Sequence, residues 1–273
     1  MCIRDSLLGF ENEELVFPNV HHAFRFCLLT LDGGTLKARE AKFQFFARKS
    51  EDLNDPDRQF ELTAEDLSLI NPNTRTAPIF RSRVDAELTK KIYRRVPILV
   101  RDGFAPANPW SIRFQQGLFN MTSDSHLFRT AVELAGEGAA LHGSVWIRGE
   151  TSWLPLYEAK MMHQFTHRWG DYSLQPPGRT HTELPVVPLQ FLHDTDYVVQ
   201  PRYWVAYRDV VSAIDRPARW LLVFRDITGT EKVRTMIAAA LPVAGVGHSL
   251  PLLWADAPPP RLAALLGLSL IHI

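Results

Sequence analysis

The segment with the clearest chemical character is residues 71–95, NPNTRTAPIFRSRVDAELTKKIYRR. The whole chain is neutral, with 30 basic and 30 acidic residues, but this segment holds seven basic residues against two acids, Asp85 and Glu87. Such a concentration of cations can neutralise the phosphates of a nucleic acid, or it can be the solvated face of a helix. The basic residues are Arg75, Arg81, Arg83, Lys90, Lys91, Arg94 and Arg95.

Two other sites place a guanidinium next to aromatic rings. One is Arg168-Trp169, and the other is Arg202-Tyr203-Trp204. Arginine contacts phosphates and aromatic rings stack on bases, so either site could bind a nucleic acid. For either site alone, aromatic packing in the core beside a surface arginine is the stronger interpretation.

The segment EAK at residues 158–160 matches the end of a nuclease signature in which two acids hold magnesium and a lysine supports the attacking water. The nearest plausible upstream acid is Asp124. His163 and His167 are four residues apart, which would place both imidazoles on one helix face, but the metal motif with this spacing needs a glutamate where Gln164 stands. We therefore predict no metal site and keep a magnesium-dependent nuclease module as an alternative.

Two Asn-Pro pairs, in Asn71-Pro72-Asn73 and Asn108-Pro109-Trp110, are similar to the Asn-Pro-Pro-aromatic loop that holds a target amine in amino-methyltransferases. Both lack the second proline, and both are interpreted as turns. Gly136 and Gly138 follow a helical pattern and not a strand, which favours a helix C-cap over a cofactor loop. The sequence therefore offers no candidate residue for catalysis or for cofactor binding.

The second half of the basic segment has the pattern of a helix over residues 83–95. Ser82 and Asp85 form a capping box of the S-x-x-D type, and Pro97 ends the helix. Val84, Leu88 and Ile92 recur every four residues, which predicts that this apolar face packs on the core. The basic side chains would then project elsewhere.

The region before the basic segment has strand signals. Residues 24–31 (FRFCLLTL) and 41–45 (AKFQF) flank a turn at Asp32-Gly33-Gly34, which predicts an antiparallel hairpin. Thr63 and Asp66 form a second capping box, so a short helix should begin there and end before Pro72.

Weaker signals mark elements in the rest of the chain. Residues 125–135 and 231–240 read as helices, and the apolar run WLLVF at residues 220–224 reads as a buried strand. Residues 198–207 are strand-like, although Pro201 favours an edge or a bulge. Residues 110–120 could form a strand or a short helix.

Composition places the chain among ordinary globular proteins, with 46% hydrophobic and 22% charged residues. No apolar run approaches the ~18 residues of a membrane span, so we expect no membrane partner. Cys27 is the only cysteine outside the extreme N-terminus, and its apolar neighbours predict a buried thiol. A single cysteine forms no internal disulfide, which is typical of a reducing compartment such as the cytoplasm.

The two ends of the chain are related at the level of DNA. One set of codons for MCIRDS has a reverse complement that encodes LSLIHI in another frame. The ends resemble a translated transposase adapter used in sequencing-library preparation. We therefore expect residues 1–6 and 268–273 to be adapter-derived tags, and residues 7–267 to be an internal part of a longer protein.

Several sequence blocks then resemble, in order, the C-terminal part of bacterial adenine-specific DNA methyltransferases of restriction-modification and phage-defence systems, the type IIG methylase group. The longest block is INPNTRTAPIFRSRVDAELTKKIYRRVP, and LPLYEAKMMHQFTHRW, VVQPRYWV, WLLVFRDIT and GVGHSLPLL follow it. The resemblance implies an α+β fold, truncated at both ends. Residues 7–50 would be the terminal strands of a Rossmann-like methyltransferase domain, and residues 51–267 an α/β target-recognition region.

The resemblance also implies chemistry. Such enzymes transfer a methyl group from S-adenosyl-L-methionine to adenine N6. The glycine-rich cofactor motif and the Asn-Pro-Pro-aromatic motif of the family are absent here, so we expect no cofactor on this fragment and no activity by itself. We expect double-stranded DNA as the partner. The predicted contacts are the seven basic residues above with Arg168, Arg202, Tyr203 and Trp204. A segment that binds an acidic protein is a further alternative.

Overall fold

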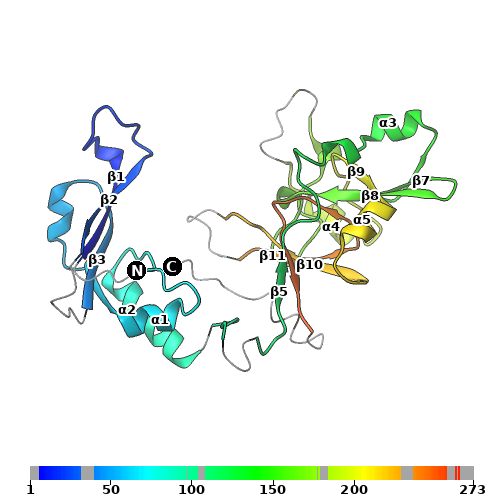
Figure 1. Ribbon diagram of the computed structural model, residues 1–273. Coiled ribbons are helices and arrows are strands. Elements are labelled where there is room, and N and C mark those ends of the chain that lie inside the picture. Colours follow the sequence, from blue (N-terminus) through cyan, green and yellow to red (C-terminus); the bar gives the residue numbers. More distant parts are fainter. Residues whose placement is uncertain are drawn as a thin grey trace. The chain divides into compact units, whose positions relative to one another are not determined.

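The computed structural model describes residues 6–31, 40–96, 98–103, 108–176, 178, 184–228, 236–256, 262 and 264. The chain divides into two compact units, residues 1–109 and residues 110–272, and each is treated separately below (Figure 1). It is a mixed α/β protein with several small sheets and short helices. No helix in the described ranges is both long and apolar enough to cross a bilayer.

The first unit is built on a four-stranded sheet with the order β2-β1-β3-β4. The strands are β1 (Ser6–Glu11), β2 (Arg25–Thr30), β3 (Glu40–Ala47) and β4 (Phe60–Thr63). β1 is antiparallel to β2 and parallel to β3, and β3 is antiparallel to β4. The predicted hairpin between residues 24–31 and 41–45 is therefore wrong, because β1 lies between these strands. The predicted turn at residues 32–34 lies outside the described residues.

The predicted boundary between residues 50 and 51 falls inside this first unit. It lies at the start of the 3-10 helix η2 (Ser50–Asn54), between β3 and β4, which pair with each other. The compact units instead meet at residues 109 and 110. The assignment of residues 7–50 and 51–267 to two functions stays a prediction.

Two helices follow β4, and both begin at the predicted caps. α1 (Ala64–Ile70) has Thr63 as its N-cap, and the Thr63 and Asp66 side chains cap each other's backbone amides. α2 (Arg83–Arg95) begins after Ser82, whose hydroxyl accepts from the backbone N–H of Asp85. The predicted bounds of α2 and the predicted end of α1 before Pro72 are confirmed.

The predicted buried face of α2 is wrong. Val84 and Leu88 are 71% and 53% exposed, and Ile92 is only half-buried. The helix instead packs through Ala86 and Thr89, which are buried. Ala86 joins a core of aromatic and aliphatic side chains from β3, β4 and α1, including Phe43, Phe60, Leu62 and Ile70. Small residues allow two helix backbones to approach closely, and α2 packs against α1; this contact prevails over the larger apolar residues on the other face of α2.

β2 is also unlike its prediction. Cys27 is exposed and not buried, and the neighbouring Leu28 and Leu29 are 55% and 44% exposed. The backbone N–H of Asn12, directly after β1, donates to the carbonyl oxygen of Phe24, so this carbonyl group points toward β1. Backbone groups alternate along an antiparallel strand, and those of Arg25, Cys27 and Leu29 therefore point toward the outer edge, where no further described strand pairs.

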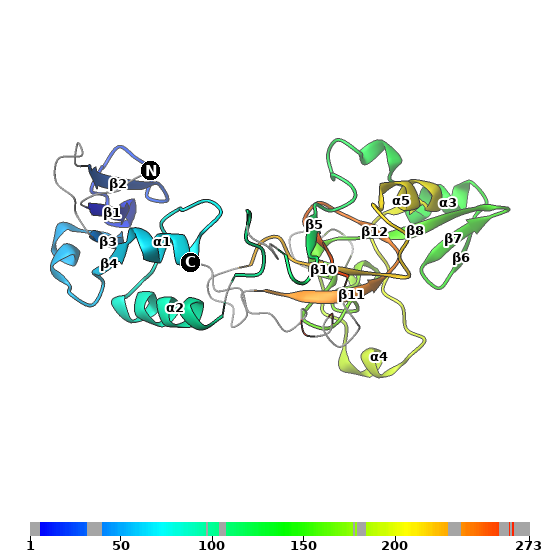
Figure 2. The same cartoon turned by 60° about the horizontal axis from the view of Figure 1, so that its bottom comes forward.

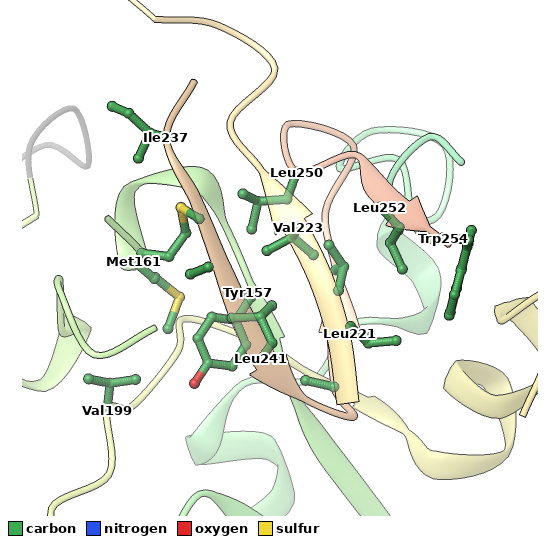
Figure 3. Close-up of a cluster of buried hydrophobic side chains, with 14 of the residues drawn as sticks. Tyr157, Met161, Val199, Leu221, Val223, Ile237, Leu241, Leu250, Leu252 and Trp254 are labelled. Carbon is green, nitrogen blue, oxygen red and sulfur yellow. The ribbon is translucent and has the colours of Figure 1, made fainter. Parts of the chain in front are cut away.

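The second unit contains two sheets. One has the order β11-β10-β13-β5, and the other has the order β12-β8-β7-β6 with β9 paired to β8. The strands are β5 (Arg113–Gln115), β6 (Ala140–His142), β7 (Val145–Arg148), β8 (Thr151–Tyr157), β9 (Trp204–Ala206), β10 (Trp220–Phe224), β11 (Ala238–Pro242), β12 (Gly245–Val246) and β13 (Leu252–Trp254). A core of buried side chains, among them Met161, Leu221, Val223 and Leu250, joins them (Figure 3).

The helices of the second unit are short: α3 (Ala131–Gly136), α4 (Leu189–His193) and α5 (Tyr207–Ala213), with the 3-10 turns η3 (Ser125–Leu127), η4 (Ala159–Met161) and η5 (Tyr172–Leu174). Figure 2 shows that α3 and α5 lie next to the sheet that contains β6, β7 and β8. The buried strand at residues 220–224 is confirmed as β10. The helix predicted at residues 125–135 begins only after its Thr130 cap, and the strand predicted at 198–207 is reduced to β9. Where residues 231–240 were predicted helical, residues 231–235 lie outside the described part and β11 begins at Ala238.

The rotation of α2 can be tested by a pair of substitutions. Ala86→Leu should lower the free energy of unfolding by about 1–3 kcal/mol, because the larger side chain has no space in the buried contact. Leu88→Ala should change it by less than about 0.5 kcal/mol, because that side chain is largely exposed. Urea denaturation of both variants measures the difference. A larger loss for Leu88→Ala would contradict the observed rotation.

Candidate nucleic-acid interface

The outer face of α2 carries an exposed ridge of four residues at helical spacing: Val84, Leu88, Lys91 and Arg95. We call it the α2 ridge. It lies opposite the buried contact of Ala86 and Thr89, since residues three and four apart share a helix face. A shallow hollow of about 530 Å³ lies over this face, lined by Arg83, Val84, Glu87, Leu88, Lys91 and Arg94. The ridge therefore offers two cations beside two apolar side chains.

Three of the predicted cations of α2 have partners within the unit. Lys90 is buried, and its Nζ lies 2.5 Å from the Glu87 carboxylate and 3.5 Å from the carbonyl oxygen of Glu61. We therefore correct its predicted role from DNA contact to anchoring of the helix.

The other two paired cations are more exposed. Arg94 donates to Oδ1 of Asp66 at 3.1 Å, and Arg83 lies 3.6 Å from Asp57. For Lys91 and Arg95, the described residues provide no ion pair.

The loop before α2 is held by its own asparagines. Asn71 donates to the carbonyl oxygen of Thr76 at 2.9 Å, and Asn73 donates to that of Val100 at 3.0 Å. Asn73 also accepts from the backbone N–H of Asp102. These contacts support the interpretation of Asn71-Pro72 as a turn. In this turn the Arg75 side chain is exposed, and the Arg75 backbone is left-handed with φ 52°.

Arg81 lies against an unusual strand position. Its Cζ atom is 4.5 Å from the centroid of the Phe46 ring, and Phe46 has φ 61°, which is strained for an aromatic residue. This residue sits at a register shift between β1 and β3. A cavity of about 310 Å³ beside it is lined by Arg81, Arg48, Arg58 and other charged residues of both signs. Arg81 is thus exposed and partly fixed by a cation–π contact.

In the second unit, the structure separates the predicted contact residues. The Arg168 guanidinium donates to the carbonyl oxygens of Leu192, Asp194 and Tyr197 and so binds the end of α4. Trp204 is buried, and its Nε1 donates to the carbonyl oxygen of Ser144. We correct both residues to structural roles, because the guanidinium is occupied and the indole is not accessible to a base.

Arg202 remains available for contact with a partner, whereas Tyr203 is half-buried and its ring packs against Phe128 with centroids 5.8 Å apart. Arg202 is exposed, and its Cζ lies 4.8 Å from the centroid of the Tyr203 ring.

The segment at residues 158–160 belongs to a polar network. Tyr172 donates its hydroxyl to Oε1 of Glu158 at 2.6 Å, and Lys160 lies 3.5 Å from Oε2. Burial, followed by the hydrogen bond to Glu158, raises the pKa of Tyr172. Asp124 accepts from the backbone N–H of Asn120 and so closes its own turn. The described residues contain no group of three or more His, Cys, Asp or Glu side chains that could hold a metal ion.

Beside it, a buried aspartate holds the loop of η5. Asp171 accepts from the hydroxyls of Tyr197 at 2.5 Å and Ser173 at 2.7 Å, and from the backbone N–H of Ser173. Burial, followed by the hydrogen bond to Asp171, raises the pKa of Tyr197. Every oxygen of this carboxylate has a donor, which is the condition for burying a charge.

The two histidines do not lie on one helix face, because η4 ends at Met161 and residues 163 and 166 pair as an isolated bridge. The His163 ring packs on Trp169 with centroids 4.4 Å apart. Burial lowers the pKa of His167, whose ring meets that of Tyr157 edge-on. Both side chains pack among aromatic residues, which removes the geometric basis of the two-histidine metal motif.

The chain matches no protein-family model, no curated protein and no solved structure. The α2 ridge therefore rests on its own geometry. Sequence periodicity did not locate it, because the apolar spacing of Val84, Leu88 and Ile92 favours one face, whereas Ala86 and Thr89 on the other face are buried.

A glycine below η4 provides a test of this region. A Cβ on Gly170 would lie 2.6 Å from the carbonyl oxygen of Lys160 and 2.8 Å from Cδ2 of Leu184. Gly170→Ala should therefore lower the free energy of unfolding by about 1–3 kcal/mol. The control is Gly136→Ala in α3, where a Cβ meets nothing within 4 Å. Thermal denaturation compares the two, and equal stabilities would contradict this packing.

Proposed function

We propose that this chain recognises duplex DNA as the target-recognition part of a site-specific adenine-N6 DNA methyltransferase of a restriction-modification or phage-defence system. The observation that carries the proposal is the α2 ridge within the sequence block most similar to that group. Its Lys91 and Arg95 are exposed, and the described residues provide no ion pair for either. Phosphate positioning is the role best suited to such cations.

The chemistry of the reaction requires a surface of this kind. Adenine N6 lies inside the duplex, so an enzyme that methylates it must turn the base out of the stack. A separate surface must hold the flanking duplex and read base edges in the grooves. Arg75 on the loop before α2, and Arg202 with Tyr203 in the second unit, are further candidates for contact. S-adenosyl-L-methionine would be the methyl donor of the parent enzyme, and we assign no residue of this chain to it.

The edge strand β2 supports the proposal that the first unit includes part of a larger, Rossmann-like sheet. Exposed apolar residues lie on both of its faces, since Leu28 and Leu29 alternate in direction, while the polar Arg25 and Thr30 stand at its two ends. A strand that is apolar on both faces is typical of the interior of a sheet covered on both sides. A longer protein could supply that cover along the outer edge of β2.

Duplex binding can be measured as a function of salt. The affinity should fall steeply as salt rises, and the double variant Lys91→Ala/Arg95→Ala should reduce the slope of log K against log salt by about 0.9 for each phosphate that is no longer neutralised. Fluorescence anisotropy with a labelled duplex gives both quantities. The matched control is Lys42→Ala/Lys49→Ala, which removes the same charge from two exposed positions of the first unit that also make no ion pair with the described residues.

Three results would count against the proposal. They are no duplex binding by a folded sample, binding that does not depend on salt, or an equal change of slope in the control variant. Binding of an acidic protein in competition with DNA would instead favour the interaction-segment alternative.

The β2 edge has its own test. In the background Cys2→Ser, the exposed Cys27 should react with a thiol reagent at nearly the rate of an unfolded control. In a longer protein that includes the sequence upstream of this chain, the same thiol should become protected by at least about tenfold if the sheet continues there. Equal reactivity in both proteins would rule out cover at this edge.

A further inference from the structure

Strand β10 has two different faces. Leu221 and Val223 are fully buried in the core of the second unit. Trp220 and Leu222 alternate onto the opposite face, here called the outer face, where Leu222 is also buried and Trp220 is exposed. On the neighbouring strand β13, Leu252 lies opposite Val223, so Leu253 lies beside Leu222 on that outer face. The outer face is therefore apolar at this end of the sheet.

A cavity of about 360 Å³ lies where this outer face begins. Its lining includes Trp220, Leu222, Leu253 and Trp254, together with the guanidinium-bearing Arg216 and Arg219. This volume lies within the range of small-molecule sites, about 300–1000 Å³. An exposed aromatic ring in the lining favours a flat ligand, and the arginines favour a ligand that carries a negative charge.

One wall of this cavity is held in place. Trp254 donates its Nε1 to Oε1 of Gln115 at 2.8 Å, and the Gln115 amide donates to the carbonyl oxygen of Ala213 at 3.0 Å. Arg216 lies over the Trp254 ring, with its Cζ 5.3 Å from the centroid, and it forms an ion pair with Asp256. The charge of Arg216 is therefore already balanced.

Another part of the lining, on the outer face of β10, is accessible to a ligand. Trp220 is 42% exposed, although it is the largest apolar side chain on this strand. Arg219 precedes it and is exposed, and within the described ranges no ion pair involves it. An accessible indole beside an unpaired guanidinium matches a base that stacks and a phosphate that pairs.

We propose that this cavity binds an unstacked nucleobase that carries a phosphate group, with the base against Trp220 and the phosphate near Arg219. The inference goes beyond duplex recognition by the α2 ridge, because a stacked duplex offers no free base. A nucleotide outside a duplex, or one turned out of it, would offer both parts. The site uses residues of the second unit only.

The test is calorimetric titration of the full chain with thymidine 5′-monophosphate, thymidine and deoxyribose 5-phosphate. The nucleotide should bind most tightly. Trp220→Ala should weaken its binding about tenfold or more, and Trp220→Phe should retain most of it, because each aromatic ring provides a stacking surface. Arg219→Ala should weaken binding of the nucleotide but not of thymidine. Arg208→Ala, at an exposed arginine elsewhere in the second unit, is the control of equal charge.

Several outcomes would overturn the inference. One is binding of deoxyribose 5-phosphate as tight as that of the nucleotide, and another is nucleotide binding that is unchanged in Trp220→Ala. Equal effects of Arg219→Ala and Arg208→Ala would remove the phosphate contact. Absent nucleotide binding together with salt-dependent duplex binding would reject this site and leave the proposed function intact, whereas the reverse pattern would reject the proposed function alone.

Discussion

The rotation of α2 about its own axis is the constraint on which the candidate interface depends. Three contacts fix it: buried Ala86 in the core of the first unit, Lys90 at the carbonyl oxygen of Glu61, and Arg94 at Asp66. These residues are four apart and share one side of the helix. Asp66 also caps α1 with its other oxygen, so one carboxylate joins the start of α1 to the end of α2. A half-turn of the helix about its axis would expose the Lys90 ammonium that is now anchored and would bury Lys91 and Arg95.

This arrangement divides the cations by what they contact. Lys90 and Arg168 bind carbonyl oxygens inside the protein, which means that their charges stabilise the fold and are not free for a partner. Lys91 and Arg95 have no such contact among the described residues, and they share their face with Val84 and Leu88. A ridge that places cations beside apolar side chains matches the proposed DNA partner, because phosphates are charged and parts of the groove edges are apolar.

The second unit relies on a comparable polar anchor. Asp171 accepts hydrogen bonds from Ser173 and Tyr197 and so connects η5 to the segment that follows α4. Arg168 donates to the carbonyl oxygen of Leu192 and so binds the end of α4. Glu158, Lys160 and Tyr172 form a second network beside it. A carboxylate and a lysine that look catalytic in sequence are here partners of each other and of a tyrosine. The same unit leaves Trp220 exposed beside a cavity that apolar side chains and two arginines line.

The sequence by itself determined the local features of this protein. The caps at Thr63 and Ser82 and the buried strand β10 follow from hydrogen bonds and apolar runs within a few residues, and they could be predicted. The concentration of charge in residues 71–95 was also evident. Only the tertiary structure decided which face of α2 is buried, that β1 separates β2 from β3, and that Trp204 lies in the core while Cys27 does not. Those outcomes depend on which segments distant in sequence come into contact, and periodicity within one segment carries no information about its partner.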